Sequence, residues 1–513
     1  MHTQPEGKLH RKLKARHLEM IAIGGTIGTG LLLKSGSAIY TAGPLGALIC
    51  FVIAGFQVFF VSSAIGEMAA FLPMEGAFSH MPARFVNPAF GFASGWNYWL
   101  SWVLGVPAEL SAISSFMAFW TTAIPSWAWT AIYLVPVASV NLLGVSSFGE
   151  TEFALSLIKV IAIVIFLFIS LLMWFGVGQS TGPLWFVNWS PALVGDDSLT
   201  RFNNIASAMT TAFFSFGGTE LIGLTASEAE NPRVSIPKAI NGTFIRILLF
   251  YLGSILMIGL LLSPDNEVLD PNNPAGISQS PFVYVYNSFG IKAAEHIMNA
   301  VIILATLSAA NSSIYACSRT LTRLAEENSA PKFLGRVDSR GVPVASVALS
   351  ILFGVIAIIG GYLLSPQDVF NFLSNLIALA IEINWLIMSY THLRFRAGFL
   401  AQGYKLADLP YVAPFYPYAD YLSLVMGLVV SVFLNWFIAQ SWLYAGVPLT
   451  ILWFLGKGVW DGYKKGNVLS GFALVPLMEM DFETGRYVEA EGETQGKKQG
   501  LFTRLIGKLK GGR

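Results

Sequence analysis

The segment Ile23-Gly-Gly-Thr-Ile-Gly-Thr-Gly-Leu31 lies in an apolar stretch and holds four glycines within seven residues. Each glycine costs up to about 1 kcal/mol of helix propensity, so a continuous helix is disfavoured here. A second apolar stretch contains Phe214-Ser-Phe-Gly-Gly-Thr-Glu220, which is also rich in glycine and ends in a carboxylate. We therefore expect two broken helices. Close helix packing is the alternative for the first segment, because Gly24 and Gly28 also have the GxxxG spacing.

The whole chain of 513 residues is strongly apolar: 54% of its residues are hydrophobic, 12% are charged, and the mean hydropathy is +0.60. Soluble domains carry about 25% charged residues, so this chain lacks the polar residues to cover a surface in water. The net charge of +1 argues against a nucleic-acid partner, and two cysteines and six scattered histidines argue against a disulfide scaffold or a metal site. We interpret the chain as an all-α polytopic membrane protein, surrounded by lipid and without a cofactor.

A membrane-spanning helix needs about 20 mostly apolar residues. The apolar runs of the sequence predict twelve such spans. They lie near 18–40, 44–71, 89–119, 125–144, 152–175, 203–228, 238–262, 285–318, 343–362, 367–393, 420–438 and 441–460. The membrane domain is therefore expected to cover residues 18–462, between an N-terminal segment, 1–17, and a tail, 463–513.

Basic residues gather on one side of this predicted membrane domain. Five of them lie between Lys8 and Arg16, just before the first span, whereas the predicted loop 176–200 has none. Short basic flanks prefer the cytoplasm, so both termini are expected there. Residues 501–510 fit either a short amphipathic helix on the inner leaflet or a solvated, disordered end, and the sequence indicates no trafficking partner for the tail.

The two broken spans occupy matching places in the chain. Each is the first of a set of five spans, one set over about 18–175 and the other over about 203–393, and two C-terminal helices follow at about 420–460. An odd number of spans places the second set in the opposite orientation. Glycine-interrupted helices at matching positions of such inverted repeats are typical of a transporter site.

A broken helix frees backbone groups in the middle of the membrane, which is tolerable only beside a polar cavity. Freed N–H groups in the first break would bind an anion such as a carboxylate, and freed carbonyls in the sixth span would bind an ammonium group. A site with both ends describes a zwitterionic amino acid. The substrate-binding residues expected in the two breaks are Thr26, Gly28, Thr29, Gly30, Phe214, Ser215, Phe216 and Glu220.

With these motifs the sequence resembles the amino acid permeases of the yeast amino acid transporter type, in the amino acid–polyamine–organocation superfamily. The resemblance covers most of the chain, to about Arg396. Besides the two glycine-rich segments, the stretches that carry it are Gly95-Trp-Asn-Tyr-Trp99, Phe148-Gly-Glu-Thr-Glu-Phe153, Ser156-Leu-Ile-Lys159 and Glu228-Ala-Glu-Asn-Pro232. The resemblance implies import of L-amino acids across the plasma membrane by proton symport. It also implies that Thr29 and Gly30 meet the substrate carboxylate and that Glu220 faces its amino group.

Ionisable residues at membrane depth are functional candidates, because burying them without a partner is costly. Lys159 would exchange a proton in the transport cycle, and the resemblance places it where related transporters hold sodium; snorkelling or a contact with the broken first helix is the alternative. Glu109 is a proton-coupling candidate or a structural, protonated glutamate. The resemblance adds Ser101 and Glu109 as selectivity positions, whereas Glu220 is a proton-coupling candidate or an N-cap.

Side-chain specificity is less defined. Many similar permeases have a small polar residue where this chain has Ile377, and an apolar one near Glu382. Ile377 would narrow the substrate pocket, whereas Glu382 as a second membrane carboxylate would favour cationic substrates. Phe216, at the break, is either a lid over the site or part of the core.

The sequence thus predicts a proton–amino acid symporter that works by alternating access, with amino acids and protons as its ligands. A non-transporting amino acid sensor and a proton-independent exchanger remain alternatives, since both would use the same fold. An enzyme is not expected, because the sequence shows neither a nucleophile–base pair nor a metal cluster.

Overall fold

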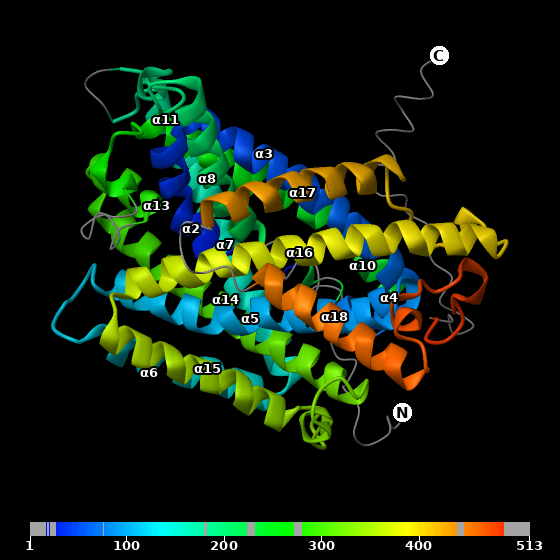
Figure 1. Ribbon diagram of the computed structural model, residues 1–513. Coiled ribbons are helices and arrows are strands. Elements are labelled where there is room, and N and C mark those ends of the chain that lie inside the picture. The colour runs from blue at the N-terminus through cyan, green and yellow to red at the C-terminus, as the bar shows by residue number, and fades with distance from the viewer. Residues whose placement is uncertain are drawn as a thin grey trace, which may run out of the picture.

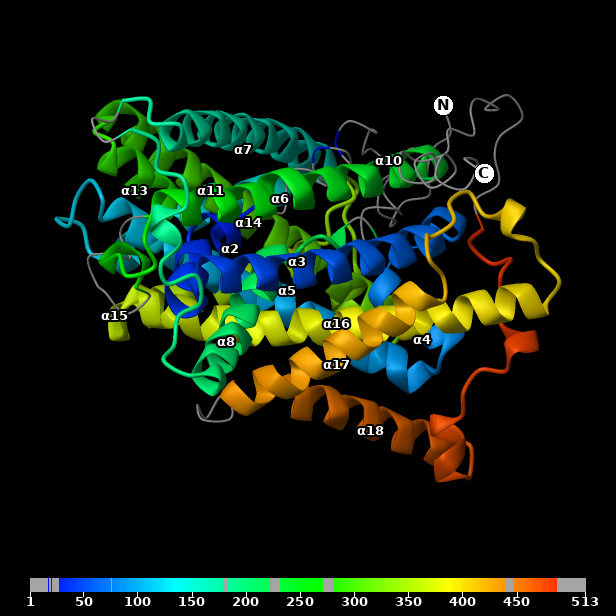
Figure 2. The same cartoon turned by 90° about the horizontal axis from the view of Figure 1, so that it is seen from above.

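The computed structural model describes residues 17, 20, 27–74, 76–178, 182–221, 223, 231–270, 280–438 and 446–486. Their regular structure is entirely helical, and none of these residues lies in a strand. The long helices run side by side in roughly one direction (Figures 1 and 2). Helices α11 and α13 lie at one end of the bundle, and α4 lies at the other, which we call the α4 end.

The longer helices are α3 (Lys34–Phe71), α5 (Pro88–Met117), α6 (Ser126–Leu143), α7 (Val145–Trp174), α8 (Ser198–Phe216), α14 (Lys292–Glu326), α15 (Val344–Leu363), α16 (Pro366–Ala401), α17 (Tyr418–Ile438) and α18 (Gly446–Lys464). Shorter segments are α2 (Thr29–Leu32), α4 (Ala77–Phe85), α10 (Pro232–Ile245), the π-helix η4 (Arg246–Leu252), α11 (Gly253–Leu261) and α13 (Pro281–Ser288). Single 3-10 turns are η2 (Val187–Trp189), η5 (Glu267–Leu269), η6 (Lys332–Gly335), η7 (Leu406–Asp408), η8 (Val468–Phe472) and η9 (Leu477–Glu479).

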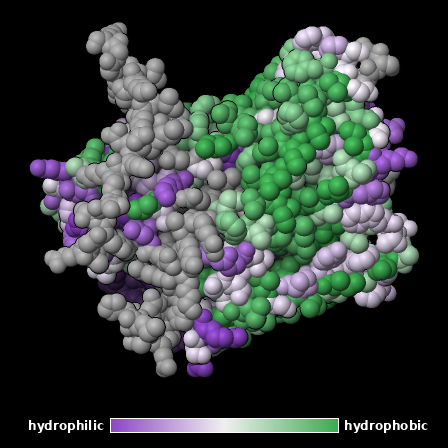
Figure 3. Space-filling model, turned by 180° about the vertical axis from the view of Figure 1, so that it is seen from behind, coloured by the Kyte–Doolittle hydropathy of each residue, from purple (hydrophilic) through white to green (hydrophobic). Residues whose placement is uncertain are grey.

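The helices are apolar on the outside as well as the inside. Within the described residues, eight helical stretches are long and apolar enough to cross a membrane. Large side chains of α7, among them Ile161, Ile165 and Phe168, are exposed. Figure 3 shows a broad apolar face with polar residues gathered at its two ends. An apolar belt between polar ends suits a bilayer, and the prediction of an all-α polytopic membrane protein is confirmed.

Several predicted boundaries differ from the observed helices. The predicted spans 18–40 and 44–71 meet within α3, where the chain turns at Gly43 with φ +80°. A side chain would be strained in that left-handed conformation. The predicted span 285–318 is wrong as one helix, since α13 and α14 are separated near Gly290, which also has positive φ (+72°).

Two sets of closely packed neighbours, which we call the two helix groups, are joined where α16 contacts α3 and α8. In the first group α3 packs against α8, α10 and α11, and in the second group α5 packs against α14 and α16. Helix α2 lies between them, because it contacts α8 and α3 as well as α14. The interface between these two groups contains the two breaks, and it is where the cavity described below lies.

The first part of the tail packs against the helices at the α4 end, a contact that the sequence does not indicate. The Asn87 side chain donates to the carbonyls of Gly471 (3.0 Å) and Ala473 (2.8 Å). Phe482 is 2% exposed and contacts the rings of Phe85, with centroids 5.4 Å apart, and Phe399, 5.5 Å apart. The predicted alternatives for 501–510 concern residues outside the described part of the chain.

Candidate functional site

The first break ends where α2 begins. Gly28 is the N-cap of α2, has extended backbone angles (φ −134°, ψ −156°) and makes no side-chain cap bond. Thr29 is fully buried, and its Oγ1 donates a 2.9 Å hydrogen bond to Oε1 of Glu109. A Cβ on Gly30 would lie 2.4 Å from the Cα of Ser215. Glycine at this position therefore lets the two broken segments touch.

The second break follows the end of α8 at Phe216. Gly217 leaves the helix with ψ 145°, and Gly218 has φ +91°, a conformation that favours glycine. The chain is held in this shape by Thr219, whose Oγ1 donates to the Phe216 carbonyl over 2.6 Å. Nη2 of Arg246 in turn donates to that Oγ1 over 2.6 Å. A buried arginine thus anchors the turn beyond the helix.

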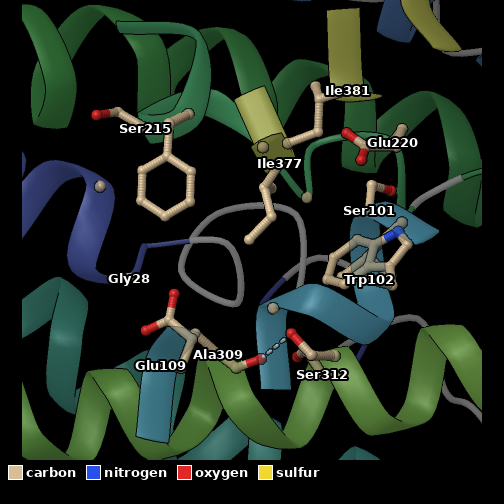
Figure 4. A pocket seen from close by; sticks show the side chains of 17 residues that line it. Gly28, Ser101, Trp102, Glu109, Ser215, Glu220, Ala309, Ser312, Ile377 and Ile381 are labelled. Atoms are coloured by element: carbon tan, nitrogen blue, oxygen red, sulfur yellow. Dashed lines mark hydrogen bonds between the residues drawn. The ribbon is translucent and has the colours of Figure 1, made fainter. Parts of the chain in front are cut away.

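A cavity of about 70 Å³ lies between the two breaks. Figure 4 shows the lining side chains of α5, α14, α16 and the second break, and Gly28 of the first break beside them. The lining residues are Gly28, Gly30, Ser101, Trp102, Gly105, Glu109, Phe214, Ser215, Gly217, Gly218, Glu220, Leu221, Ala309, Ser312, Ser313, Ile377 and Ile381. The cavity therefore combines exposed backbone, hydroxyl groups and apolar side chains.

Two carboxylates line this cavity. Glu109 is 8% exposed and Glu220 is 3% exposed, and Oε2 of each has no hydrogen-bond partner in the structure. Among the described lining residues these are the only ionisable side chains. Buried polar atoms are usually paired. Two orphaned carboxylate oxygens beside one cavity are therefore acceptors suited to a cationic or proton-carrying ligand.

Most of the predicted substrate residues lie around this cavity. They are Gly28, Gly30, Ser101, Phe214, Ser215, Glu220 and Ile377, and the proton-coupling candidate Glu109 lies beside the same cavity. Thr29 does not line it but bonds to Glu109, and Thr26 lies outside the described residues. Phe216 is fully buried, stacks on Tyr251 with centroids 4.3 Å apart, and does not line the cavity. Its position fits the core alternative, whereas two other aromatic residues, Phe214 and Trp102, line the cavity.

Lys159 on α7 does not line the cavity. Its Nζ donates to the carbonyl of Ile27 (3.2 Å), which lies within the first break, and to Oγ of Ser308 (2.8 Å). The hydroxyl of Ser308 donates to Glu152 over 2.7 Å, and the Asn311 side chain donates to the same carboxylate over 3.1 Å. The contact with the broken first helix, which was the structural alternative to a proton-exchange role for Lys159, is thus present.

Sequence reasoning missed Glu152 as part of this network. Glu152 is fully buried and lies seven residues before Lys159, a spacing that places both residues on one face of α7. That spacing is the signal that could have identified it. Ser312 and Ser313 on α14 were also missed. Their signal is a run of small and polar residues, 308–313, in the middle of an apolar helix.

Glu382 on α16 lies away from the cavity, although its neighbour Ile381 lines it. Glu382 is fully buried, and its Oε1 accepts a 2.7 Å hydrogen bond from Nε2 of Gln57 on α3. The hypothesis that Glu382, as a second membrane carboxylate, favours cationic substrates gains no support from this position, because Glu382 does not line the cavity. The second carboxylate beside the cavity is Glu109.

A helical membrane protein with a polar cavity between two broken helices is suited to carrying small solutes. Comparison with known proteins agrees. The model of the amino acid permease family matches residues 17–466, so the chain belongs to this family. It is a membrane permease, not an enzyme, and amino acid transport is the class of function that the family defines. The resemblance seen in the sequence motifs is thus confirmed.

Individual relatives are permeases of several substrates. The chain is 40% identical to the lysine-specific permease of Lactococcus lactis over 496 residues, and this aligned region covers 93% of each of the two chains. It is 39% identical to the histidine permease of the same organism, over 93% of this chain and 98% of that one. It is also 39% identical to the basic amino-acid permease of Saccharomyces cerevisiae, over 84% of this chain and 76% of that one.

Proposed function

We propose that this permease imports amino acids by proton symport and that its preferred substrates are cationic. The observation that carries the proposal is the pair of buried carboxylates beside one cavity, each with an unpartnered Oε2. No Lys, Arg or His is found among the described lining residues. An amino acid with a cationic side chain brings two positive groups, which is one for each carboxylate.

The substrate's carboxylate would bind at the first break. The N–H groups of Thr29, Gly30 and Leu31 begin a helix, so they have no partner within it. The α-ammonium group would bind at the second break. The carbonyls of Phe214 and Phe216 there already accept bonds from Gly217 N–H and the Thr219 hydroxyl, which makes Glu220 the main acceptor.

The side chain of the substrate would extend toward Glu109. This carboxylate lies in the cavity wall on the α5 side and keeps one free oxygen after accepting from Thr29. A charge-assisted bond at such a buried position is stronger than a neutral one. The substrates in the names of relatives, lysine, histidine and basic amino acids, support this assignment.

Proton coupling would use Glu109, Glu220 and Lys159. The two glutamates bound the cavity, so a proton or a substrate cation neutralises the same buried groups. Lys159 contacts the first break through the Ile27 carbonyl and belongs to the Ser308–Glu152 network. A change in its protonation would therefore act on the broken helix that binds the carboxylate.

The transport cycle would be alternating access within a twelve-helix fold of two inverted repeats, 18–175 and 203–393. The group of helices around α3 and α8 would rock against the group around α5, α14 and α16, since the cavity lies at their interface. The protein would lie in the plasma membrane, with both termini on the cytoplasmic side. The basic segments of the sequence support this orientation.

The test is uptake by the purified protein in proteoliposomes, using labelled lysine, arginine, histidine, leucine and glutamate with and without an inward proton gradient. We expect saturable uptake of the cationic amino acids that is accelerated by the gradient. Binding of an amino acid without uptake of any would favour the sensor alternative. Uptake that ignores the gradient would favour the exchanger.

A further inference from the structure

Two polar contacts join α3 to α16 across the interface between the two helix groups. Gln57 bonds to Glu382, and ten residues further along both helices Glu67 faces His392. Ten residues correspond to about 15 Å of helix, so the two contacts are separate. Both carboxylates are fully buried. Because Glu67 and Glu382 lie between the same two helices, the partners of the two carboxyl groups can be compared directly.

Glu67 has the partners of an ionised carboxylate. It accepts from Nε and Nη2 of Arg396 and accepts a 2.6 Å hydrogen bond from the backbone N–H of Ala413. Nε2 of His392 lies 3.2 Å from it, while Nδ1 of the same ring bonds to Asp420. A buried negative charge needs this kind of compensation.

Glu382 has no such partners among the described residues. Its Oε1 accepts from the amide of Gln57 on α3 and lies against Gly427 of α17, as does the side chain of Leu386 from its own helix. None of these three groups titrates or carries charge. Four charged groups of these helices, Glu67, His392, Arg396 and Asp420, gather at the other contact. Lys34 and Asp368 lie in the first turns of α3 and α16, and Arg394 bonds to carbonyls of Phe85 and Val475. Glu382 is therefore in a place where the neutral form of a carboxyl group is favoured.

The hydrogen bonds also fit a neutral carboxyl group. Oε2 of Glu382 and Oε1 of Gln57 are both buried and lack a partner in the structure. An ionised Glu382 and the Gln57 amide together present three acceptor oxygens, but the Gln57 N–H group bonds to only one of them. The other two oxygens therefore lack a donor. A proton on Glu382 supplies that donor, because a protonated carboxyl group donates to an amide oxygen while it accepts from the amide N–H.

We propose that Glu382 is a proton-binding site separate from the substrate cavity, and that it must be protonated for α3 and α16 to pack together as they do here. This inference rests on the proposed proton symport. When the two helix groups separate, water reaches the carboxyl group and the proton leaves, giving a carboxylate and a hydrated proton. When they close, the carboxylate takes up a proton again.

The site is coupled to the cavity through one residue. Ile381, next to Glu382, lines the cavity, and its Cδ1 would be 2.4 Å from a Cβ placed on Gly217. Any shift of α16 that breaks the contact between Gln57 and Glu382 therefore also moves Ile381, which packs against Gly217 in the second break. Protonation of Glu382 and closure around the substrate become parts of one movement.

The first test measures protons moved per substrate in proteoliposomes, from charge flux and labelled uptake in the same sample. Glu382→Gln keeps a neutral partner for Gln57 but cannot release a proton. We expect it to transport with fewer protons per substrate and with a flatter pH dependence than the wild type. Asp368→Asn, an exposed carboxylate in the first turn of the same helix, is the matched control and should keep the wild-type ratio. An unchanged ratio in Glu382→Gln would overturn the proposal.

The second test uses the wild-type protein, so it decides the matter if the variant does not fold. Dicyclohexylcarbodiimide is an apolar reagent that modifies protonated carboxyl groups, and peptide mass spectrometry locates the adduct. We expect modification of Glu382 that declines as the pH is raised. Modification of Glu109 or Glu220 with none at Glu382 at any pH would refute it. A failure of proton symport itself would look different, because wild-type uptake would then ignore the gradient.

Discussion

Gly30 and Ser215 lie so close together that a Cβ on the glycine would be 2.4 Å from the Cα of the serine. The contact joins the two broken segments directly, and both residues line the cavity. A methyl group cannot be accommodated by a rotamer change, because the atom it meets belongs to the backbone. The shape of the cavity therefore depends on the absence of one side chain.

The first prediction concerns Gly30→Ala, which should force the two breaks apart. We expect substrate affinity to fall by at least about tenfold, equivalent to about 1.4 kcal/mol, in protein that still purifies as a monodisperse species. The measurement is equilibrium binding of labelled amino acid. Gly456→Ala is the matched control: Gly456 lies within α18 with no atom within 4 Å of an added Cβ, so affinity should be unchanged. Equal losses in both variants would refute the role of Gly30.

The second prediction concerns Glu109→Gln, which keeps an acceptor for Thr29 but removes the charge. If Glu109 binds the cationic side chain, the KM for lysine should rise about tenfold or more, since a hydrogen bond to a charged group contributes about 1.5–3 kcal/mol. The KM for a neutral amino acid such as leucine should rise much less. Uptake kinetics of both substrates give the ratio. An equal rise in the KM for lysine and for leucine would mean that Glu109 does not bind the side chain of the substrate.

The third prediction concerns the network of Lys159, Ser308 and Glu152. Lys159→Met removes the cation that Ser308 links to the buried carboxylate of Glu152. A buried charge without compensation is destabilising, so the melting temperature should fall. Glu152→Gln in the same chain should recover part of this loss. We expect a coupling energy above about 1 kcal/mol in the double-mutant cycle, measured by thermal unfolding in detergent. Strict additivity would show that the two residues act independently.

The fourth prediction concerns the docked tail. Burial alone would raise the pKa of Asp481, but hydrogen bonds from Thr484 and Glu483 and the charge of Arg84, 2.8 Å away, hold that pKa well below its usual range. A depressed pKa contributes stability above the unfolded value of about 3.9 and loses it only as the pH falls further. Tail docking should therefore be unchanged from neutral to mildly acidic pH.

Asp481→Asn tests that contact. It should increase hydrogen exchange in residues 471–486, because Arg84 then loses its ionic partner. Glu479→Gln, an exposed residue of the same segment, should leave exchange as in the wild type. Exchange that is equally slow in both variants would show that the packing of Phe482 alone holds the tail.

Much of the site could be predicted from the sequence. The cost of glycine in a helix is local, so Gly28, Gly30, Gly217 and Gly218 marked the breaks without any knowledge of neighbours. Glu109 and Glu220 stood out because a charge in an apolar run is rare. Glu152 carried the same signal, yet it was missed. Its role depends on Ser308 of α14, which bonds both to Glu152 and to Lys159 two turns further along α7.

The sequence by itself determined the class of protein and the position of the breaks, because hydropathy and glycine propensity act along the chain. Only the tertiary structure decided which polar groups face the cavity. Glu109 and Glu382 are both isolated carboxylates in apolar helices, and nothing local separates them. Packing placed one beside the two breaks and the other against Gln57, because a helix face is assigned by its neighbours and not by its own residues.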